Sequence, residues 1–313
     1  MENRLLTRER MERMLDARTG EEAAKVLTEC GYPELNQLTP SALDAMLAQA
    51  REETYRDLGG AVPDPDLVDV FRIKYDYHNA KVLIKAQAVG TDPDRLLMEG
   101  GRWVPSALRD AFEKEDLKAC TPMFRAAVLQ ARDLLASSAD PQGADFLLDQ
   151  AYYAEMLQTA RETGSEFLTG YVRLAIDGAN LRAVVRAARM ERGAEFLARV
   201  LLEGGNVPVD RLTAAKEGEA LTLFGGPLAE AAALGASCLA PGSGGLTAFE
   251  RACDDALTAY LSAAKRVPFG EQPVIGYLYA RENEFTAIRI ILSGRMAGLE
   301  GDTIRERLRE SYV

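Results

Sequence analysis

The sequence has few of the residues on which metal sites and acid–base sites usually depend. It contains one histidine, His78, in 313 residues. This number excludes a zinc site built from several histidines, and no cysteine lies near His78 in sequence to complete a mixed site. Acid–base catalysis by His78 would also need an orienting partner and a pocket. The sequence therefore favours a structural role for His78.

Cysteines are also few, and no two of them form a Cys-x-x-Cys pair. Together with the lack of a signal peptide, this predicts reduced thiols in a cytosolic protein. We expect each to serve as a small buried apolar residue: Cys30, Cys120, Cys238 and Cys253.

Basic residues and long apolar runs are in short supply. The chain has 37 Lys and Arg against 48 Asp and Glu, a net charge of −11. This sign opposes nonspecific contact with nucleic acid or anionic lipid. No apolar run approaches the roughly 20 residues that a membrane-spanning helix needs. We therefore expect no nucleic-acid partner and no direct lipid insertion, so membrane association would depend on a protein partner.

The chain does have enough apolar residues, 47 % of the total, to bury a sizeable core. Its glycine-rich run, Gly242-Ser243-Gly244-Gly245, lacks the Lys-Ser/Thr ending of a phosphate-binding loop. The composition thus predicts a folded chain of two ordinary or three small domains, without a nucleotide site.

One stretch recurs three times. It begins with an acid, has Asn or Ala three positions later and a base five positions later, and continues with apolar residues. The copies are Asp76-Tyr77-His78-Asn79-Ala80-Lys81, Asp177-Gly178-Ala179-Asn180-Leu181-Arg182 and Glu284-Phe285-Thr286-Ala287-Ile288-Arg289. A recurrence of this kind predicts internal triplication.

Two further landmarks keep the same order. An apolar residue followed by Asp recurs at intervals of 105 residues, at Asp44, Asp149 and Asp254. A Glu-Gly-Gly run precedes a Val-Pro pair at 99–105 and at 203–208, and residues 310–313 end the chain at the corresponding place. We place the boundaries of three similar domains at the Val-Pro pairs: 1–103, 104–206 and 207–313.

Each copy reads as helical. Apolar residues from Val68 to Ala86 recur three to four positions apart, as on one face of a helix, and Gly90 is a plausible helix end. Thr39 and Asp140, each followed by proline, predict helix starts, and Thr247 with Glu250 predicts a capping box. No sustained alternation of period two appears, so the predicted fold class is all-α.

The acid–Asn–base stretches are the most plausible functional residues, and three interpretations remain open for them. A structural network is the interpretation we favour, a partner interface is the second, and catalysis is the third, because a catalytic site is not expected in triplicate. Arg72 with Asp76, Arg173 with Asp177 and Arg281 with Glu284 have helical ion-pair spacing. No catalytic, cofactor-binding or metal-binding residue is predicted.

The bases of these stretches need acids from elsewhere, because Lys81 and Lys85 place like charges one turn apart. We expect Asp44, Asp149 and Asp254 to pair with Lys81, Arg182 and Arg289 respectively, each within its own repeat. Buried pairs of this kind fix register more reliably than they add stability.

The chain resembles the family of the C subunits of V/A-type ATPases and ATP synthases, whose eukaryotic vacuolar member is called the d subunit. The resemblance lies in Glu2-Asn3-Arg4-Leu5-Leu6-Thr7, in the stretches that begin at Asp76 and Asp177, and in the segment from Tyr277 to Arg289. It runs from one end of the chain to the other. Family members usually carry a further stretch before the first motif, which leaves the contacts of that segment open.

The resemblance implies a funnel-like socket of three similar helical domains with pseudo-threefold symmetry. The socket would sit on the cytoplasmic face of the membrane proteolipid ring and receive the foot of the central shaft, made of the D and F subunits. The protein would transmit torque between ATP turnover and proton or sodium transport as one monomeric copy per complex, without being an enzyme and without a cofactor. The alternative is an all-helical enzyme or regulatory module that uses one acid–Asn–base stretch.

Overall fold

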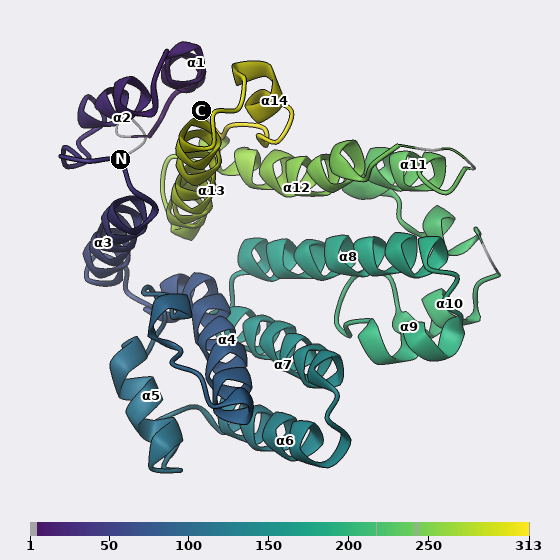
Figure 1. Ribbon diagram of the computed structural model, residues 1–313. Helices are drawn as coiled ribbons and strands as arrows, with labels where there is room; N and C mark the ends of the chain where they lie inside the picture. The colour runs from purple at the N-terminus through teal and green to yellow at the C-terminus, as the bar shows by residue number, and fades with distance from the viewer. Residues whose placement is uncertain (1–4, 217, 241, 243, 313) are drawn as a thin grey trace. The chain divides into compact units, whose positions relative to one another are not determined.

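The computed structural model describes residues 5–216, 218–240, 242 and 244–312. Residues 2–4 of the N-terminal motif, Ser243 of the glycine-rich run and Val313 lie outside the described residues. Every regular element in these ranges is helical, which confirms the all-α prediction (Figure 1).

The chain forms two compact units, residues 1–62 with 243–313 and residues 63–242. The first contains α1 (Arg8–Asp16), α2 (Gly20–Thr28), α3 (Pro40–Gly59), α12 (Thr247–Leu261), η5 (Ser262–Arg266), α13 (Glu271–Met296) and α14 (Gly301–Arg305). The second contains α4 (Asp66–Val89), η2 (Asp94–Leu96), α5 (Pro105–Glu113), α6 (Pro122–Ser138), α7 (Pro141–Glu162), α8 (Glu166–Arg189), α9 (Ala194–Val200), α10 (Val209–Ala214), η3 (Ala220–Leu223), η4 (Gly226–Leu228) and α11 (Ala229–Ser237). The division at 103/104 and 206/207 and the pseudo-threefold funnel remain predictions.

Within residues 63–242, α7 is the helix on which α4, α6 and α8 pack. Two aromatic contacts secure this bundle. Tyr77 of α4 meets Phe124 of α6 edge to face, with ring centroids 5.2 Å apart, and Phe71 stacks on Tyr171 of α8 at 5.5 Å. Rings that pack in these geometries add stability beyond the area they bury. Helix α8 also packs on α9, η3 and α11.

The other unit is built around α13, which contacts α2 and α3 from the start of the chain and α12, η5 and α14 from its end. Its core therefore mixes residues that are far apart in sequence. Its buried apolar members include Leu6, Met14, Leu15, Leu27, Leu43, Leu47, Phe285, Ile288, Ile291 and Leu292.

Most predicted helix ends are confirmed. Thr39 and Asp140 cap α3 and α7 through their side chains, with proline at the first helical position, and Gly90 ends α4 at φ +73°. The capping box at Thr247 is wrong, because α12 begins with Leu246 at the cap position and without a side-chain cap.

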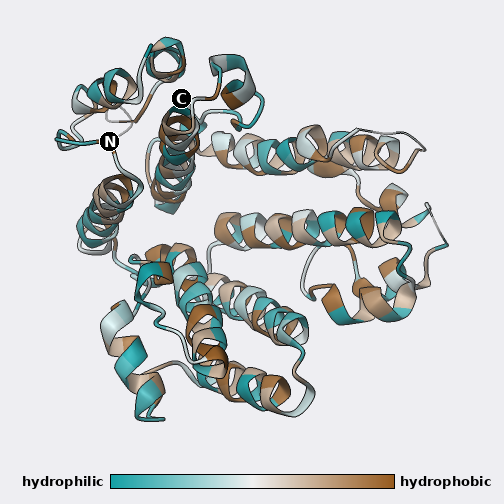
Figure 2. Cartoon of the chain, viewed as in Figure 1, coloured by the Kyte–Doolittle hydropathy of each residue, from teal (hydrophilic) through white to brown (hydrophobic). Residues whose placement is uncertain are grey.

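Polar and apolar residues are interspersed along the helices (Figure 2). None of the helices in the described ranges is both long and apolar enough to cross a membrane.

Candidate functional site: carboxylate slots on the three longest helices

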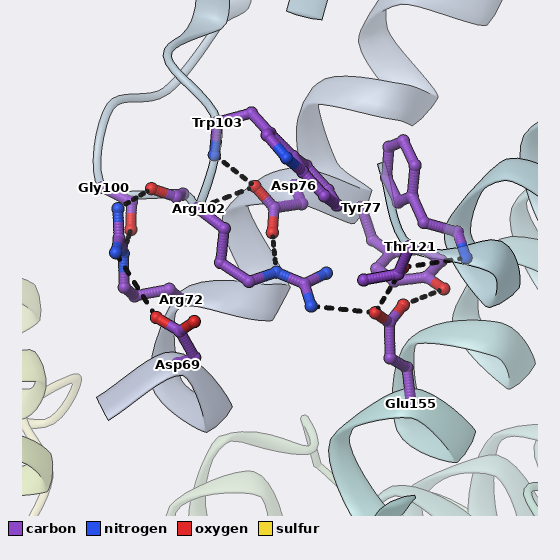
Figure 3. A network of polar contacts seen from close by, with 11 residues as sticks. Asp69, Arg72, Asp76, Tyr77, Gly100, Arg102, Trp103, Thr121 and Glu155 are labelled. Atoms are coloured by element: carbon purple, nitrogen blue, oxygen red, sulfur yellow. Dashed lines mark hydrogen bonds and ion pairs between the residues drawn. The ribbon is translucent and has the colours of Figure 1, made fainter. Parts of the chain in front are cut away.

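The acid of the first repeated stretch, Asp76 on α4, is fully buried and bound by the loop that follows its own helix. The Oδ1 atom of Asp76 accepts the backbone N–H groups of Arg102 at 2.9 Å and Trp103 at 3.5 Å. Its Oδ2 atom accepts Nε of Arg102 at 2.7 Å (Figure 3). We call this carboxylate with its loop donors the first slot.

A second buried carboxylate extends the first slot to two more helices. Nη1 of Arg102 donates to Glu155 Oε1 of α7 at 2.8 Å (Figure 3). Tyr77 of α4 and Thr121, which caps α6, donate their hydroxyls to the same carboxylate, each at 2.7 Å. The Arg102 guanidinium thus joins α4 to α7, and the Glu155 carboxylate joins α7 to the cap of α6.

Burial raises the pKa of Asp76 to about 6, against the opposing effects of Arg102 and the loop N–H groups. Removal of a carboxylate from water favours its neutral form, and the adjacent guanidinium favours the charged form.

The Gly-Gly pair of the loop is needed for this close approach. A Cβ on Gly101 would lie 2.4 Å from Asp76 Oδ1, and Gly100 has φ +104°. A side chain at Gly101 would displace the carboxylate, and one at Gly100 would strain the backbone. The Glu-Gly-Gly landmark therefore marks the point where the chain returns to α4.

The second slot repeats this geometry around Asp177 on α8. Its carboxylate accepts the N–H groups of Asn206 and Val207, each at 3.1 Å, and the Asn206 side-chain amide at 2.8 Å. A Cβ on Gly205 would lie 2.3 Å from Asp177 Oδ1, and Gly204 has φ +95°. Burial raises the pKa of Asp177 as well.

The repeated asparagine serves the same loops. Asn79 accepts the N–H of Met98 at 2.8 Å and donates to its carbonyl at 2.9 Å. Asn180 makes the same pair of bonds with Leu202, both at 2.8 Å. Each asparagine thus binds both polar groups of one loop residue, which satisfies backbone groups that burial would otherwise leave unpaired.

In the third repeat, the N-terminal segment takes the place of the loop. Glu284 on α13 accepts the backbone N–H of Leu6, the hydroxyl of Tyr32 and the guanidinium of Arg281. Leu6 precedes Thr7, the cap of α1, as Arg102 and Trp103 precede α5. Burial raises the pKa of Glu284 too. We call this carboxylate with its donors the third slot.

The bases of the repeats bind acids, but of a different repeat from the one expected. Lys81 contacts Asp149 at 2.5 Å, and Arg289 contacts Asp44 at 2.9 Å. Asp254 pairs with Arg309 at 2.5 Å. Pairing within one repeat is therefore wrong for Lys81 and Arg289. The physical reason is that the helices that carry these two acids pack on a helix of another repeat, α7 on α4 and α3 on α13.

The predicted pairs along the central helices have mixed outcomes. The pair of Arg281 with Glu284 is confirmed. Arg72 contacts Asp69 at 3.3 Å and the carbonyls of Gly100 and Gly101, so it binds the same loop that closes the first slot.

Two remaining candidates lie on the central helices. Lys85 binds Asp145 at 2.6 Å, so an acid from another helix does face the first pair of bases. Arg182 is half-buried on α8, and His78 lies with its Nε2 3.0 Å from the Leu96 carbonyl.

Sequence reasoning missed Arg102, Glu155, Asn206 and Leu6 as members of the slots. A signal existed for the first and third of these, because Arg102 and Asn206 directly follow the repeated Glu-Gly-Gly landmark. No comparable signal marks Glu155, since its place opposite Arg102 depends on how α7 packs.

The slots are suited to holding segments together rather than to chemistry. Their carboxylate oxygens are bound by N–H, guanidinium or hydroxyl donors of the chain itself. Across the part of the chain that the structure describes, no three His, Cys, Asp or Glu side chains form a group that could hold a metal ion.

Comparison with known proteins gives one consistent result. A family model described as ATP synthase (C/AC39) subunit matches residues 1–307. The C subunit of the V-type sodium ATPase of Enterococcus hirae is 23 % identical over 98 % of this chain and 94 % of its own length. The C subunit of the A-type ATP synthase of Haloquadratum walsbyi is 26 % identical over 94 % and 91 %. The C subunit of the V-type ATP synthase of Thermus thermophilus is 24 % identical over 78 % and 74 %.

Proposed function

We propose that this chain, which belongs to the ATP synthase (C/AC39) subunit family, is the non-catalytic adaptor of a rotary ATPase. In this role it couples the central shaft, made of the D and F subunits, to the membrane proteolipid ring. It lies on the cytoplasmic face of the membrane through these protein partners, as one copy per complex. Torque transmitted through it links ATP turnover to proton or sodium transport.

The observation that supports this proposal is the recurrence of the carboxylate slot on α4, α8 and α13. An adaptor under torsional load must resist local bending. Buried charge-assisted hydrogen bonds between a helix and a distant segment are directional and about twice as strong as neutral ones. Three such attachments suit a stiff body better than a catalytic site, which gains nothing from being triplicated.

The slot residues are then structural, and the partner contacts lie on exposed parts of the three proposed helical domains. We expect those domains to surround a socket for the end of the shaft. The net charge of −11 suits contact with protein surfaces rather than with anionic lipid.

Binding is the first test. The purified chain is mixed with the D–F shaft and, separately, with the detergent-solubilised ring, and each mixture is resolved by size exclusion. We expect a complex with one copy of the chain in both cases. Binding to neither partner would contradict the proposal and favour an enzyme or a regulatory module.

Coupling is the second test, in a reconstituted complex that contains either wild-type chain or a variant. Asp177→Asn weakens the second slot, whereas Lys81→Ala removes only a partly exposed ion pair. We expect Asp177→Asn to retain binding and to lower the number of ions moved per ATP, while Lys81→Ala changes neither. Equal ratios in both variants would contradict a mechanical role for the slot.

A further inference from the structure

The unit formed by residues 1–62 and 243–313 is assembled from the two ends of the chain. Its N-terminal part, residues 5–62, carries α1, α2 and α3, and we call it the N-terminal arm. Figure 1 shows the arm in purple to blue and α13 in yellow-green. The peptide chain leaves the arm at residue 62 and returns to this unit only after residue 242. The arm is therefore held on α13 and α14 by noncovalent contacts.

The third slot is also the one whose donor is farthest away in sequence. The N–H donors of the first and second slots lie 26 and 29 residues from their carboxylates, whereas Leu6 lies 278 residues from Glu284. A donor on a short loop stays near its acceptor when the bond opens, so the bond reforms readily. A donor 278 residues away has no short loop to return it to its acceptor when the bond opens.

The third slot differs from the others in how its segment is bound. Ala287 stands where Asn79 and Asn180 bind both polar groups of a loop residue, and alanine has no amide with which to do so. Among the described residues, one backbone N–H, that of Leu6, reaches Glu284, whereas two reach each of the other carboxylates. Within the described residues, fewer backbone hydrogen bonds thus reach Glu284 than reach Asp76 or Asp177.

The arm and α13 also share an apolar core and further polar contacts, which include a buried ion pair of Arg51 with Glu282 at 3.7 Å. Tyr55 donates to Glu282 at 2.5 Å, Arg281 donates to Thr54 at 3.3 Å, and Arg289 pairs with Asp44. Gly59 and Gly60 follow at the end of α3, where their backbone freedom would allow the chain to swing.

We propose that the N-terminal arm is a strap that detaches from α13 as one unit while residues 63–242 stay folded. Glu284 is the residue that holds the strap in its attached position. Detachment exposes the apolar face of α13 around Phe285, Ile288 and Leu292. Because that face is large, the open form is a minor state that appears in exchange measurements rather than in the average structure. This inference does not depend on the proposed partners.

Hydrogen–deuterium exchange of the full chain tests the strap. In the wild type, amides of α1–α3 should share one opening free energy that is lower than that of α7 and α8. Glu284→Gln should speed exchange throughout α1–α3 by about tenfold, since it weakens charge-assisted bonds to Leu6, Tyr32 and Arg281. Asp177→Asn is the matched control and should speed exchange only within residues 63–242.

A disulfide cross-link provides an independent test. A Cβ on Gly20 of α2 would lie 3.7 Å from Cβ of Arg295 on α13, which is the separation that a disulfide requires. Oxidised Gly20→Cys/Arg295→Cys should slow exchange of α1–α3 at least tenfold relative to its own reduced form, to the rate set by global unfolding.

Two results would overturn the strap. One is exchange of α1–α3 at the same rate as α7 in wild type and in the reduced cross-link variant. The other is an effect of Glu284→Gln on residues 63–242 as large as its effect on the arm.

Discussion

The first and second slots share their backbone geometry and differ in the side chain that completes them. In both, two consecutive N–H groups of the loop bind a buried aspartate, and a glycine sits against its oxygen. The first slot adds the guanidinium of Arg102, and the second adds the neutral amide of Asn206.

The loop backbone therefore defines the slot. The side chain that follows the glycines, Arg102 or Asn206, determines how much charge is buried with the aspartate. Arg102 brings a second carboxylate, Glu155, into the interior. The first slot is therefore a buried network of three charged groups, while the loop of the second supplies neutral donors to one carboxylate. The predictions below separate these two kinds of slot.

Removal of the carboxylates should give the largest effects and should be unequal. Asp76→Ala leaves Arg102 with one buried counter-ion and two loop N–H groups without an acceptor, and we expect a loss of about 4 kcal/mol in the free energy of unfolding. Asp177→Ala leaves neutral loop donors unpaired, for about 2–3 kcal/mol. Urea unfolding followed by circular dichroism measures both losses. Equal losses would show that the guanidinium adds nothing.

The glycines that touch the carboxylates come next. Gly101→Ala and Gly205→Ala should each cost about 2–3 kcal/mol, because the added Cβ would overlap the aspartate oxygen at 2.4 and 2.3 Å. Gly59→Ala at the end of α3, where the added Cβ would contact no other part of the chain within 4 Å, is the matched control and should be neutral or slightly stabilising. Thermal unfolding of the three variants decides whether close approach matters, and similar melting temperatures for all three would refute it.

The pH dependence of stability tests the burial of Asp76 in the first slot. Burial raises the pKa of Asp76 to about 6, whereas its unfolded value lies near 4. Between these values the folded chain retains a proton that the unfolded chain has released. This contribution to stability is therefore complete below about pH 4 and is lost as the pH rises through about 6.

Asp76→Asn should lack this decline. The stability difference between wild type and variant should therefore change by about 2 kcal/mol between pH 4 and pH 7, in the direction that disfavours the wild type at higher pH. Denaturation curves at half-unit steps measure it. Parallel pH profiles for the two proteins would contradict the assignment.

The smallest effects should come from the bases outside the slots. Lys81 and Asp149 have side chains 24 % and 45 % exposed, and the pair of Arg289 with Asp44 is more exposed still. Exposed ion pairs contribute little because water screens them. Lys81→Ala and Arg289→Ala should each cost less than about 1 kcal/mol in urea unfolding. A loss as large as that of Asp177→Ala would place these bases among the structural determinants.

The sequence predicted the parts of this fold that depend on local pattern. Helical periodicity, the proline-preceded caps at Thr39 and Asp140, and the stop at Gly90 all reflect interactions within a few residues. The triplicated stretch also identified Asp76, Asp177 and Glu284, and all three are buried.

The partners of these residues were not predictable in the same way, because they depend on packing. Lys81 lies beside Asp149 and not an acid of its own repeat, since α7 packs on α4. The donor to Glu284 comes from the opposite end of the chain, at Leu6, and no spacing rule connects positions so far apart.

The claim that one slot is built three times is tested most directly at its backbone donors. Amide exchange measured by NMR at Arg102, Asn206 and Leu6 reports the bond in each slot. We expect all three amides to be protected, with Leu6 the least protected, and each to lose protection when its own carboxylate is replaced by the amide. Free exchange at Leu6 in the wild type, with Arg102 and Asn206 protected, would contradict the third slot.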